Sequence, residues 1–486
     1  MTSPDRLSRF ETSPLERSRS LVTCLAWSFR TTSLAAVLTE CLFTTMNNHT
    51  FARRRSRGGW RLAVHCQGML KALERAGVKA VADLAEAGGV RQCLEWFTRE
   101  KQWVNEQHVR ISRIPAPTFF ERERAEAMAS ALRELGCEAR LDSAGNVVAR
   151  PRKTPEGPYV VLSAHLDTVL AARTPEEIVA EPGGRLRGPG VADNGSGLAA
   201  LLAIAGALDA APMLERLHCG LLLLANVCEE GEGHLSGMRH FCEESPLGEQ
   251  ARAFVVLDGP ATDYITCSAL ESRRYEVTFS GPGGHSWSDF GVGNPAHALS
   301  RAVAHFLDGQ DGSRPEAGSR TSYNFGVIEG GTSINSIPNS AHAKVDLRSE
   351  SNQRMEELCT LLADSVDRGV ELENASATAG KVTARVRLIG SRPGGRLPEQ
   401  APILSFLKAV DSHLGIRARQ DCASTDANIP LSKGLQAVSI GAGGQGGGAH
   451  TPLEWFHSGG RDLGLKRILL LISLLMRDPL LARDGE

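Results

Sequence analysis

Short apolar segments alternate with helical segments along most of the chain. Up to residue 271 the pattern predicts helices at 60–97, 121–135, 197–208 and 238–243, and strands at 146–149, 159–163, 221–227 and 254–257. The strands are almost continuously apolar, as strands covered on both faces are. The pattern therefore predicts an α/β domain with a doubly wound sheet between helices.

After about residue 272 the pattern changes to that of a half-exposed sheet, in which apolar and polar residues alternate. The predicted order is strand, helix, two strands, helix and strand, at 275–279, 295–307, 322–328, 343–347, 353–370 and 382–388. This order is typical of a split βαβ, ferredoxin-like module. The doubly wound pattern resumes at about residue 398, with a helix at 401–414, a strand at 436–440 and a helix at 461–476. A small α+β domain is thus predicted to be inserted into a larger α/β domain.

The length of the chain agrees with two domains, because 486 residues exceed what one hydrophobic core usually serves. We place the first part of the larger domain at 61–271, the inserted domain at 272–389 and the second part at 390–486. Residues 1–60 are rich in Ser, Thr and Arg and fit neither domain. Three interpretations remain open for them: a targeting segment, a disordered tail, or upstream sequence translated from a wrongly assigned start codon.

Composition narrows the partners and the compartment. A formal net charge of -2 does not favour nucleic acid as a partner. The 11 cysteines form no CxxC pair, which is typical of proteins from a reduced compartment. No apolar run reaches the roughly 18 residues that a membrane-spanning helix needs. We therefore expect a cytoplasmic protein that binds neither nucleic acid nor membrane.

Candidate chemistry begins where the predicted strand at 159–163 ends. His165 and Asp167 follow it, and because side chains alternate along a strand, both point the same way. Imidazole is a common ligand of zinc-like ions, and a neighbouring carboxylate can fix its tautomer. A histidine at a strand end is more often a structural residue, so this pair by itself does not identify a site.

Acidic residues follow other predicted elements in the same way. Asp193 lies in a glycine-rich turn just before a helix, where helix capping would also explain it. Glu229 and Glu230 adjoin the end of a buried strand, where two carboxylates are costly unless cations pair with them. Ordinary solvated loop acids are the simpler alternative for that pair. Asp258 directly follows the next strand.

A second histidine, His450, follows a glycine run at 441–448 that lets the backbone approach another segment closely. The run lacks the GxxxxGK[ST] order of a phosphate loop. Ligands of open α/β sheets bind beyond the carboxyl ends of the strands. Two histidines and three carboxylates there suit a pair of zinc-like ions about 3.5–4 Å apart. We therefore predict a set of five metal ligands, namely His165, Asp193, Glu230, Asp258 and His450.

The order of these segments resembles a known family. The matching stretches are His165-Leu166-Asp167, Asp193-Asn194, Glu229-Glu230-Gly231, Asp258-Gly259, Gly281-Pro282-Gly283-Gly284-His285-Ser286 and His450-Thr451-Pro452. From about residue 95 to its end, the chain resembles the dinuclear zinc metallopeptidases that include peptidase T, carnosinase-type dipeptidases, glutamate carboxypeptidase and acetylornithine deacetylase. The resemblance does not extend to the residues before that point.

The resemblance implies two divalent metal ions, zinc in the first place, with cobalt or manganese as alternatives. It implies that the ligands divide into His165 and Asp258 for one ion, Glu230 and His450 for the other, and Asp193 as the bridge between them.

Two further carboxylates have implied roles in the reaction. Asp167 would support His165 from behind. Glu229 would be the general base that deprotonates the attacking water and later protonates the leaving amine.

The inserted domain resembles the family's lid and dimerisation domain, which implies a homodimer. His285 matches the residue that, in dimeric members, reaches the neighbouring subunit's site and stabilises the tetrahedral oxyanion. Asn335 and Arg348 match positions that bind the carboxylate of the substrate, and an arginine fork suits a carboxylate.

The identity of Asp258 bears on the substrate class. Aminopeptidases and dipeptidases of the family resemble this chain in having Asp there, whereas deacylases and carboxypeptidases usually have Glu. We therefore expect an exopeptidase for small peptides, either an aminopeptidase or a di/tripeptidase. The alternatives are an amidohydrolase, N-deacylase or carboxypeptidase acting on N-acyl amino acids, and a non-catalytic relative, which the complete ligand set disfavours.

Overall fold

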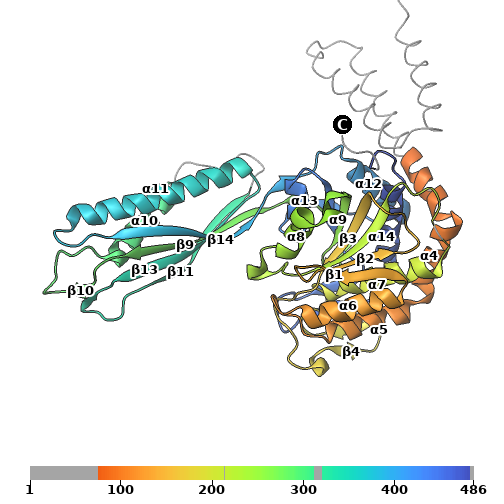
Figure 1. The fold of residues 1–486 in the computed structure, drawn as a ribbon, viewed down its shortest axis with the longest axis horizontal. Coiled ribbons are helices and arrows are strands. Elements are labelled where there is room, and N and C mark those ends of the chain that lie inside the picture. Colours follow the sequence, from red (N-terminus) through yellow and green to blue (C-terminus); the bar gives the residue numbers. More distant parts are fainter. Residues whose placement is uncertain (1–74, 213, 311–319, 482–486) are drawn as a thin grey trace, which may run out of the picture.

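The computed structural model describes residues 75–212, 214–310 and 320–481 of the chain. The segment 1–60 and the start of the helix predicted at 60–97 lie outside these residues. The described residues form two lobes with separate hydrophobic cores, and two strands join the lobes (Figure 1). We call them the larger lobe, residues 75–270 and 393–481, and the smaller lobe, residues 271–392.

The larger lobe is built on a nine-stranded mixed sheet. Its centre is four parallel strands, in the order β6 (Gly220–Asn226), β3 (Tyr159–His165), β7 (Ala251–Leu257) and β17 (Gln436–Ile440). Every residue of β3 and β6 is buried, because an apolar run without alternation suits a sheet covered on both faces. The outer strands are β1 (Cys137–Leu141) and β2 (Val147–Pro151) on one side, and β8 (Tyr264–Ala269), β15 (Gly395–Arg396) and β16 (Arg419–Ala423) on the other.

Helices enclose this sheet, with α4 and α7 on one side and α8 and α9 on the other (Figure 1). The central helix α7 is apolar on all sides and buried from residue 195 to 208, as a helix without a polar face must be. The helix bounds are α4 (Gly88–Arg99), α5 (Lys101–Ser112), α6 (Arg122–Glu134), α7 (Gly195–Ala210), α8 (Ser236–Glu244), α9 (Pro246–Glu249), α12 (Pro402–Leu414), α13 (Asn428–Ser432) and α14 (Arg461–Met476).

The smaller lobe is a four-stranded antiparallel sheet with two helices on one face. Its strand order is β11 (Thr321–Gly330), β13 (Ser340–Ser349), β9 (Glu271–Ser280) and β14 (Thr383–Arg392), and its helices are α10 (Pro295–Asp308) and α11 (Asn352–Ser376). Val277 and Phe279 face the helices, whereas Glu276 lies on the open face and pairs with Arg387 at 2.6 Å. Because polar and apolar residues alternate along the strands, one face of this sheet is open to solvent.

Two small sheets complete the structure. A two-stranded pair, β10 (Gly284–His285) and β12 (Ser336–Ile337), lies at the end of the smaller lobe that points away from the larger one (Figure 1). A four-stranded sheet in the larger lobe has the order β18 (Gln445–Gly447), β19 (Trp455–His457), β5 (Arg185–Arg187) and β4 (Val179–Glu181). This second sheet brings the segment around residue 450 beside the segment around residue 190.

The fold class predicted from the hydrophobic pattern is confirmed. Chain order in the smaller lobe, β9-α10-β11-β13-α11-β14, is the predicted split βαβ order with only the short β10 and β12 added. β17 and α14 begin and end at the predicted residues. The pattern missed β1 and β16 because these outer strands are half exposed and contain no apolar run.

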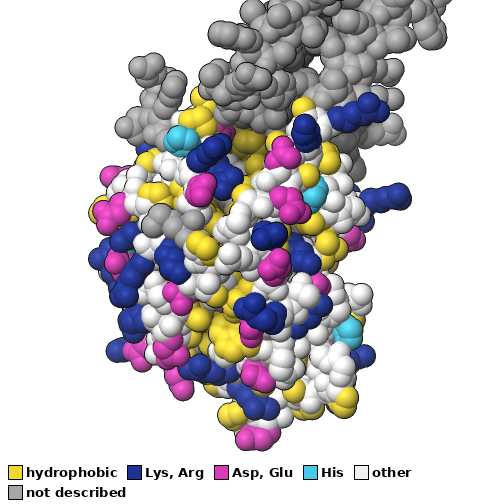
Figure 2. All heavy atoms as spheres, turned by 90° about the vertical axis from the view of Figure 1, so that its right-hand side faces the viewer, with side chains coloured by type: hydrophobic (Ala, Val, Ile, Leu, Met, Phe, Trp, Pro, Cys, Tyr) yellow, Lys and Arg dark blue, Asp and Glu magenta, His cyan; other side chains and the backbone are white. Residues whose placement is uncertain are grey.

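The surface of the larger lobe is of mixed charge. On the face that points away from the smaller lobe, Lys and Arg side chains are interspersed with Asp and Glu (Figure 2). Among the helices of the described ranges, none combines the length and the apolar character needed to cross a membrane.

A buried ion pair joins α12 and α14 and generates a prediction about stability. Arg467 is fully buried and donates from Nε and Nη2 to the two carboxylate oxygens of Asp411, both at 2.7 Å. The variant Arg467→Met leaves a buried carboxylate without its cation, so we expect the free energy of unfolding in urea to fall by about 3–5 kcal/mol. The double variant Arg467→Met/Asp411→Leu should regain most of that loss, and a double variant as unstable as the single one would contradict this account.

Candidate metal centre

The carboxyl ends of the central parallel strands meet at one edge of the sheet. His165 is the last residue of β3, Asp258 follows β7, and Glu229 and Glu230 follow β6. A cavity of about 590 Å³ lies at this edge, and both glutamates and Asp258 line it together with Asp193. Parallel strands therefore bring side chains from distant parts of the sequence to one place.

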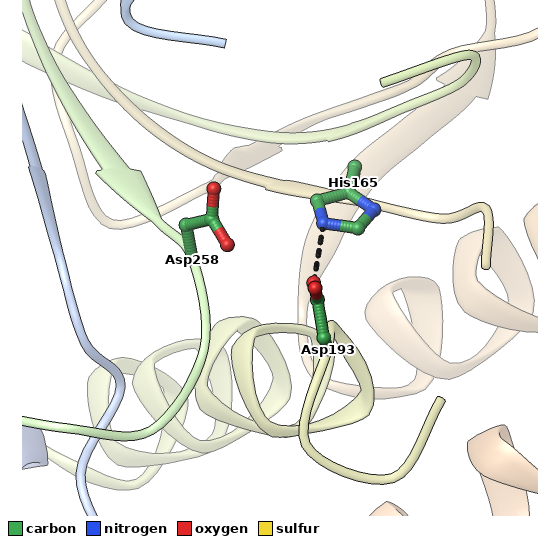
Figure 3. A group of neighbouring side chains, drawn as sticks. All are labelled: His165, Asp193 and Asp258. Atoms are coloured by element: carbon green, nitrogen blue, oxygen red, sulfur yellow. Dashed lines mark hydrogen bonds and ion pairs between the residues drawn. The ribbon is translucent and has the colours of Figure 1, made fainter. Parts of the chain in front are cut away.

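Asp193 lies between the two histidines. Its Oδ1 is 3.0 Å from Nε2 of His165, and its Oδ2 is 3.2 Å from Nε2 of His450. His450 also contacts Glu230, with Nε2 at 2.8 Å from Oε1. Figure 3 shows the carboxylate of Asp193 directed at the imidazole of His165, with Asp258 approaching from the end of β7. The carboxylate of Asp193 thus contacts both histidines, one with each of its oxygens.

Possible ligand atoms gather in three groups, and two of these groups share Asp193. Within each group, one ligand atom per residue lies within 4.8 Å of the others. The groups are His165, Asp193 and Asp258; Asp193, Glu230 and His450; and His165, Glu229 and Glu230. The first two groups contain all five predicted ligands, and Asp193 belongs to both.

The electrostatics of this cluster show a shortage of positive charge. Burial and the negative charge of Asp193 raise the pKa of Asp258 to about 7. Burial also raises the pKa of Glu230. The hydrogen bond to Asp193 raises the pKa of His450 to about 9, although burial opposes this. Carboxylate and imidazole groups are the ligand types that bind divalent cations. Such cations would supply the missing positive charge.

The carboxylate of Asp167 organises the turn that carries the two glutamates. Its Oδ1 accepts the backbone N–H of Glu229 and its Oδ2 that of Glu230, both at 2.9 Å. The Thr118 hydroxyl donates to Oδ2 at 3.0 Å. The backbone carbonyl of Asp167 lies 2.9 Å from Nδ1 of His165, which leaves Nε2 free to face Asp193. Asp167 is fully buried, so it supports the site without entering it.

A second buried carboxylate, Glu454, was not predicted. Its Oε1 accepts the backbone N–H groups of Ala192 and Asp193 at 2.7 and 2.8 Å, and its Oε2 accepts that of Gly190 at 2.7 Å. Glu454 therefore fixes the loop that presents Asp193. The only signal in the sequence is its place four residues after His450, which does not reveal the contact with a segment more than 260 residues earlier.

The glycine run before His450 has the steric role that the sequence predicts. A Cβ on Gly446 would come within 2.7 Å of Pro260 and 2.9 Å of Ala192. A Cβ on Gly441 would come within 1.8 Å of the carbonyl oxygen of Ala261. Close backbone approach at these positions, and not phosphate binding, accounts for the run.

Glu229 is buried beside the cluster and paired with an arginine that was not predicted. Nη1 of Arg392 lies 3.1 Å from Oε1 of Glu229, and Nη2 donates to the Glu229 carbonyl oxygen at 2.5 Å. Burial raises the pKa of Glu229 well above its usual range, and the charge of Arg392 opposes this shift. Arg392 is the last residue of β14, four residues beyond the strand predicted at 382–388, so no local pattern distinguishes it.

The remaining predicted residues are divided between two places. Arg348, on β13, lines the cavity and pairs through Nε with Asp346 at 2.8 Å. His285 and Asn335 lie next to each other at the far end of the smaller lobe, where the backbone N–H of Ser286 donates to the carbonyl of Asn335 at 2.9 Å. Neither lines the cavity of its own chain. The structure therefore brings Arg348 to the cavity that the candidate ligands line and keeps His285 and Asn335 away from it.

Comparisons with known proteins agree with this architecture. Residues 146–270 match the description "Peptidase family M28", and residues 271–371 match the "Peptidase dimerisation domain". The second match begins where β9 begins. Each lobe thus has its own family signature.

Similarities to individual proteins extend over most of the chain, at low sequence identity. Succinyl-diaminopimelate desuccinylase of Corynebacterium glutamicum is 28% identical over 343 residues, which cover 69% of this chain and 86% of that protein. The aminopeptidase PepT of Bacillus cereus has a TM-score of 0.60 and 17% identity, over 76% of this chain and 98% of that chain. YXEP of Bacillus subtilis, described as a dinuclear metal-binding peptidase of the M20 family, has a TM-score of 0.56 and 15% identity, over 79% and 99%.

At these identities the solved structures show the shared fold alone. The two matched regions together support a metallopeptidase enzyme in which a peptidase catalytic domain is joined to a peptidase dimerisation domain.

Proposed function

We propose that the protein is a dinuclear metal-dependent exopeptidase for small peptides, an aminopeptidase or a di/tripeptidase. The observation that carries this proposal is the pair of ligand groups that share Asp193, at the edge of a cavity that Glu229 also lines. A cavity of about 590 Å³ has room for a di- or tripeptide, within the usual range of small-molecule sites.

The five clustered side chains would hold the two ions. His165 and Asp258 would bind one, Glu230 and His450 the other, and Asp193 both, a division that the two ligand groups support. The donor set of imidazole and carboxylate suits zinc, with cobalt and manganese as alternatives. When bound, such a pair of ions lowers the pKa of water and polarises the scissile carbonyl.

Glu229 is suited to move the proton. Its carboxylate takes the proton of the attacking water and gives it to the nitrogen of the leaving amine, so one residue acts first as base and then as acid. Asp167 keeps the side chain in place by binding the backbone N–H of Glu229 at 2.9 Å. Burial beside the cavity excludes bulk water from the transferred proton.

Arg348 is the group in the cavity that suits the carboxylate of a peptide. Asp346 binds its Nε, and no hydrogen bond from the described residues engages its two terminal nitrogens, which are left for a bidentate contact. His285 and Asn335, at the far end of the smaller lobe, would act on the site of the partner subunit in a homodimer. The match to a dimerisation domain supports this arrangement.

The second candidate function is amide hydrolysis of N-acyl amino acids with the same metals. The similarity to a desuccinylase supports it. Asp258, in place of the Glu that is usual in deacylases, favours the peptidase. The two functions differ in whether the substrate has a free amino group or an acyl group on the nitrogen side of the cleaved bond.

The role of Glu229 leads to the first prediction. Glu229→Gln should lower kcat by about 10²–10⁴-fold, because the proton acceptor is lost, while two metal ions per chain remain bound. Steady-state kinetics and elemental analysis of the purified variant test this. The matched control is Glu232→Gln, at an exposed glutamate three residues on, which should keep wild-type kcat. A Glu229→Gln enzyme with more than a tenth of wild-type activity would show that the base is misassigned.

Metal removal and a substrate panel test the class of reaction. The panel contains free dipeptides, tripeptides, N-acetyl and N-succinyl amino acids and peptides with C-terminal glutamate. We expect a chelator to abolish release of amino acids from the free peptides, and zinc, cobalt or manganese to restore it. Turnover of the N-blocked substrates alone would replace the peptidase by the deacylase.

Subunit mixing tests the role of His285. His285→Ala and Glu229→Ala should each have low kcat as homodimers, because each lacks one group of the composite site. After dissociation and reassociation in equal amounts, about half of the dimers are hybrids with one complete site, so about a quarter of wild-type activity should return. A mixture that stays inactive, although hybrids form by mass spectrometry, would argue against the exchange of His285 between subunits.

A further inference from the structure

Both connections between the lobes run past the turn that carries Glu229 and Glu230. The chain enters the smaller lobe at β9 and returns to the larger lobe at the end of β14. Each of these strands places an arginine on the turn: Arg392, the last residue of β14, binds Glu229, and Arg274, on β9, donates from Nη1 to the carbonyl of Gly231 at 3.1 Å. The turn with the base is therefore held from both connections.

The connections are themselves anchored to the larger lobe by the segment 423–428. The carbonyl of Ala423 accepts the N–H of Leu270 at 2.9 Å. The side-chain amide of Asn428 donates to the carbonyls of Leu270 and Pro393, both at 3.0 Å. Asn428 thus binds at once the residue that precedes β9 and the residue that follows β14. These anchored connections fix the position of Arg392 at the end of β14.

Arg392 holds Glu229 at two points. One nitrogen binds the carboxylate oxygen Oε1 and the other binds the backbone carbonyl of the same residue, so the side chain is fixed relative to its own backbone. Nη1 also lies 3.1 Å from the hydroxyl of Ser424. Within the described part of the chain, no hydrogen bond engages the second oxygen of Glu229, Oε2.

This geometry differs from that of a substrate-binding arginine. Arg392 is buried, with 8% of its surface exposed; both of its Nη atoms are engaged and its Nε is shielded from solvent. Arg348, in contrast, has 39% of its side chain exposed and uses only Nε for Asp346. Both arginines line the cavity, but the terminal nitrogens of Arg392 are bound to Glu229, whereas those of Arg348 make no hydrogen bond to the described residues.

We propose that Arg392 is a positioning residue for the general base: it aligns Glu229 so that Oε2 is left for the reacting water, and it does so from the strand that returns from the dimerisation domain. The proposal rests on the proposed role of Glu229. The connection between the lobes thereby takes part in catalysis, because Glu229 is held in position by the last residue of β14.

Kinetics of Arg392 variants test the proposal on the best substrate of the panel. Arg392→Met should lower kcat by about 10–100-fold with KM within twofold, because the base is misaligned while substrate binding is untouched. Arg392→Lys should recover part of the loss, because it keeps the charge without the two-point grip. The matched comparison, Arg348→Met, should raise KM. A raised KM with unchanged kcat in Arg392→Met would make Arg392 a substrate ligand and overturn the proposal, as would wild-type values of both constants.

A stability measurement separates failure of this proposal from failure of the proposed function, because it needs no turnover. Thermal midpoints of the metal-loaded wild type, Arg392→Met, Glu229→Gln and the double variant form a double-mutant cycle. We expect the two single losses to add up to at least about 3 °C more than the loss in the double variant, since each single change leaves one buried partner behind. Additive losses would show that the side chains are not coupled and would overturn the proposal even for an inactive protein.

Discussion

The structure depends on the concentration of carboxylates at the carboxyl ends of β3, β6 and β7. Burial in this position disfavours negative charge, and the carboxylates repel one another, so the pKa of Asp258 rises to about 7. Such a cluster needs bound protons or positive charge in its middle to be stable. The two histidines partly provide it by contacting Asp193 from both sides, and divalent cations would provide it fully.

Two neighbouring buried side chains fix the orientation of these carboxylates. Asp167 and Glu454 are buried carboxylates that accept backbone N–H groups instead of binding a cation themselves. One holds the turn of Glu229 and Glu230, and the other holds the loop of Asp193. Each backbone hydrogen bond satisfies a buried donor and at the same time sets the direction of a functional side chain. Carboxylates of similar burial therefore differ in role because of what surrounds them.

The division into two lobes distributes the proposed site over separate bodies. The candidate ligands and the proposed base lie in the larger lobe, Arg348 lines the cavity from the sheet of the smaller lobe, and His285, on β10, lies at the distant end of that lobe. Such an arrangement would make catalysis dependent on the geometry of the connections between the lobes and of the proposed dimer. The connections are correspondingly well anchored, by one asparagine that binds the residues flanking both strands and by one arginine on each strand.

The amino-acid sequence by itself determined the class of fold and the places where chemistry could occur. Hydrophobic periodicity is a local property, so the strands, the helices and the residues at strand ends, such as His165 and Asp258, could be predicted without the structure. Glu454 and Arg392 could not be predicted, because no local pattern distinguishes them. Their roles rest on contacts with residues 261 and 163 positions away. The separation of His285 and Asn335 from the cavity of their own chain also came only from the tertiary structure. The reason is physical: the sequence specifies which groups are present, but charge compensation and the direction of a side chain depend on which distant segments fold against it.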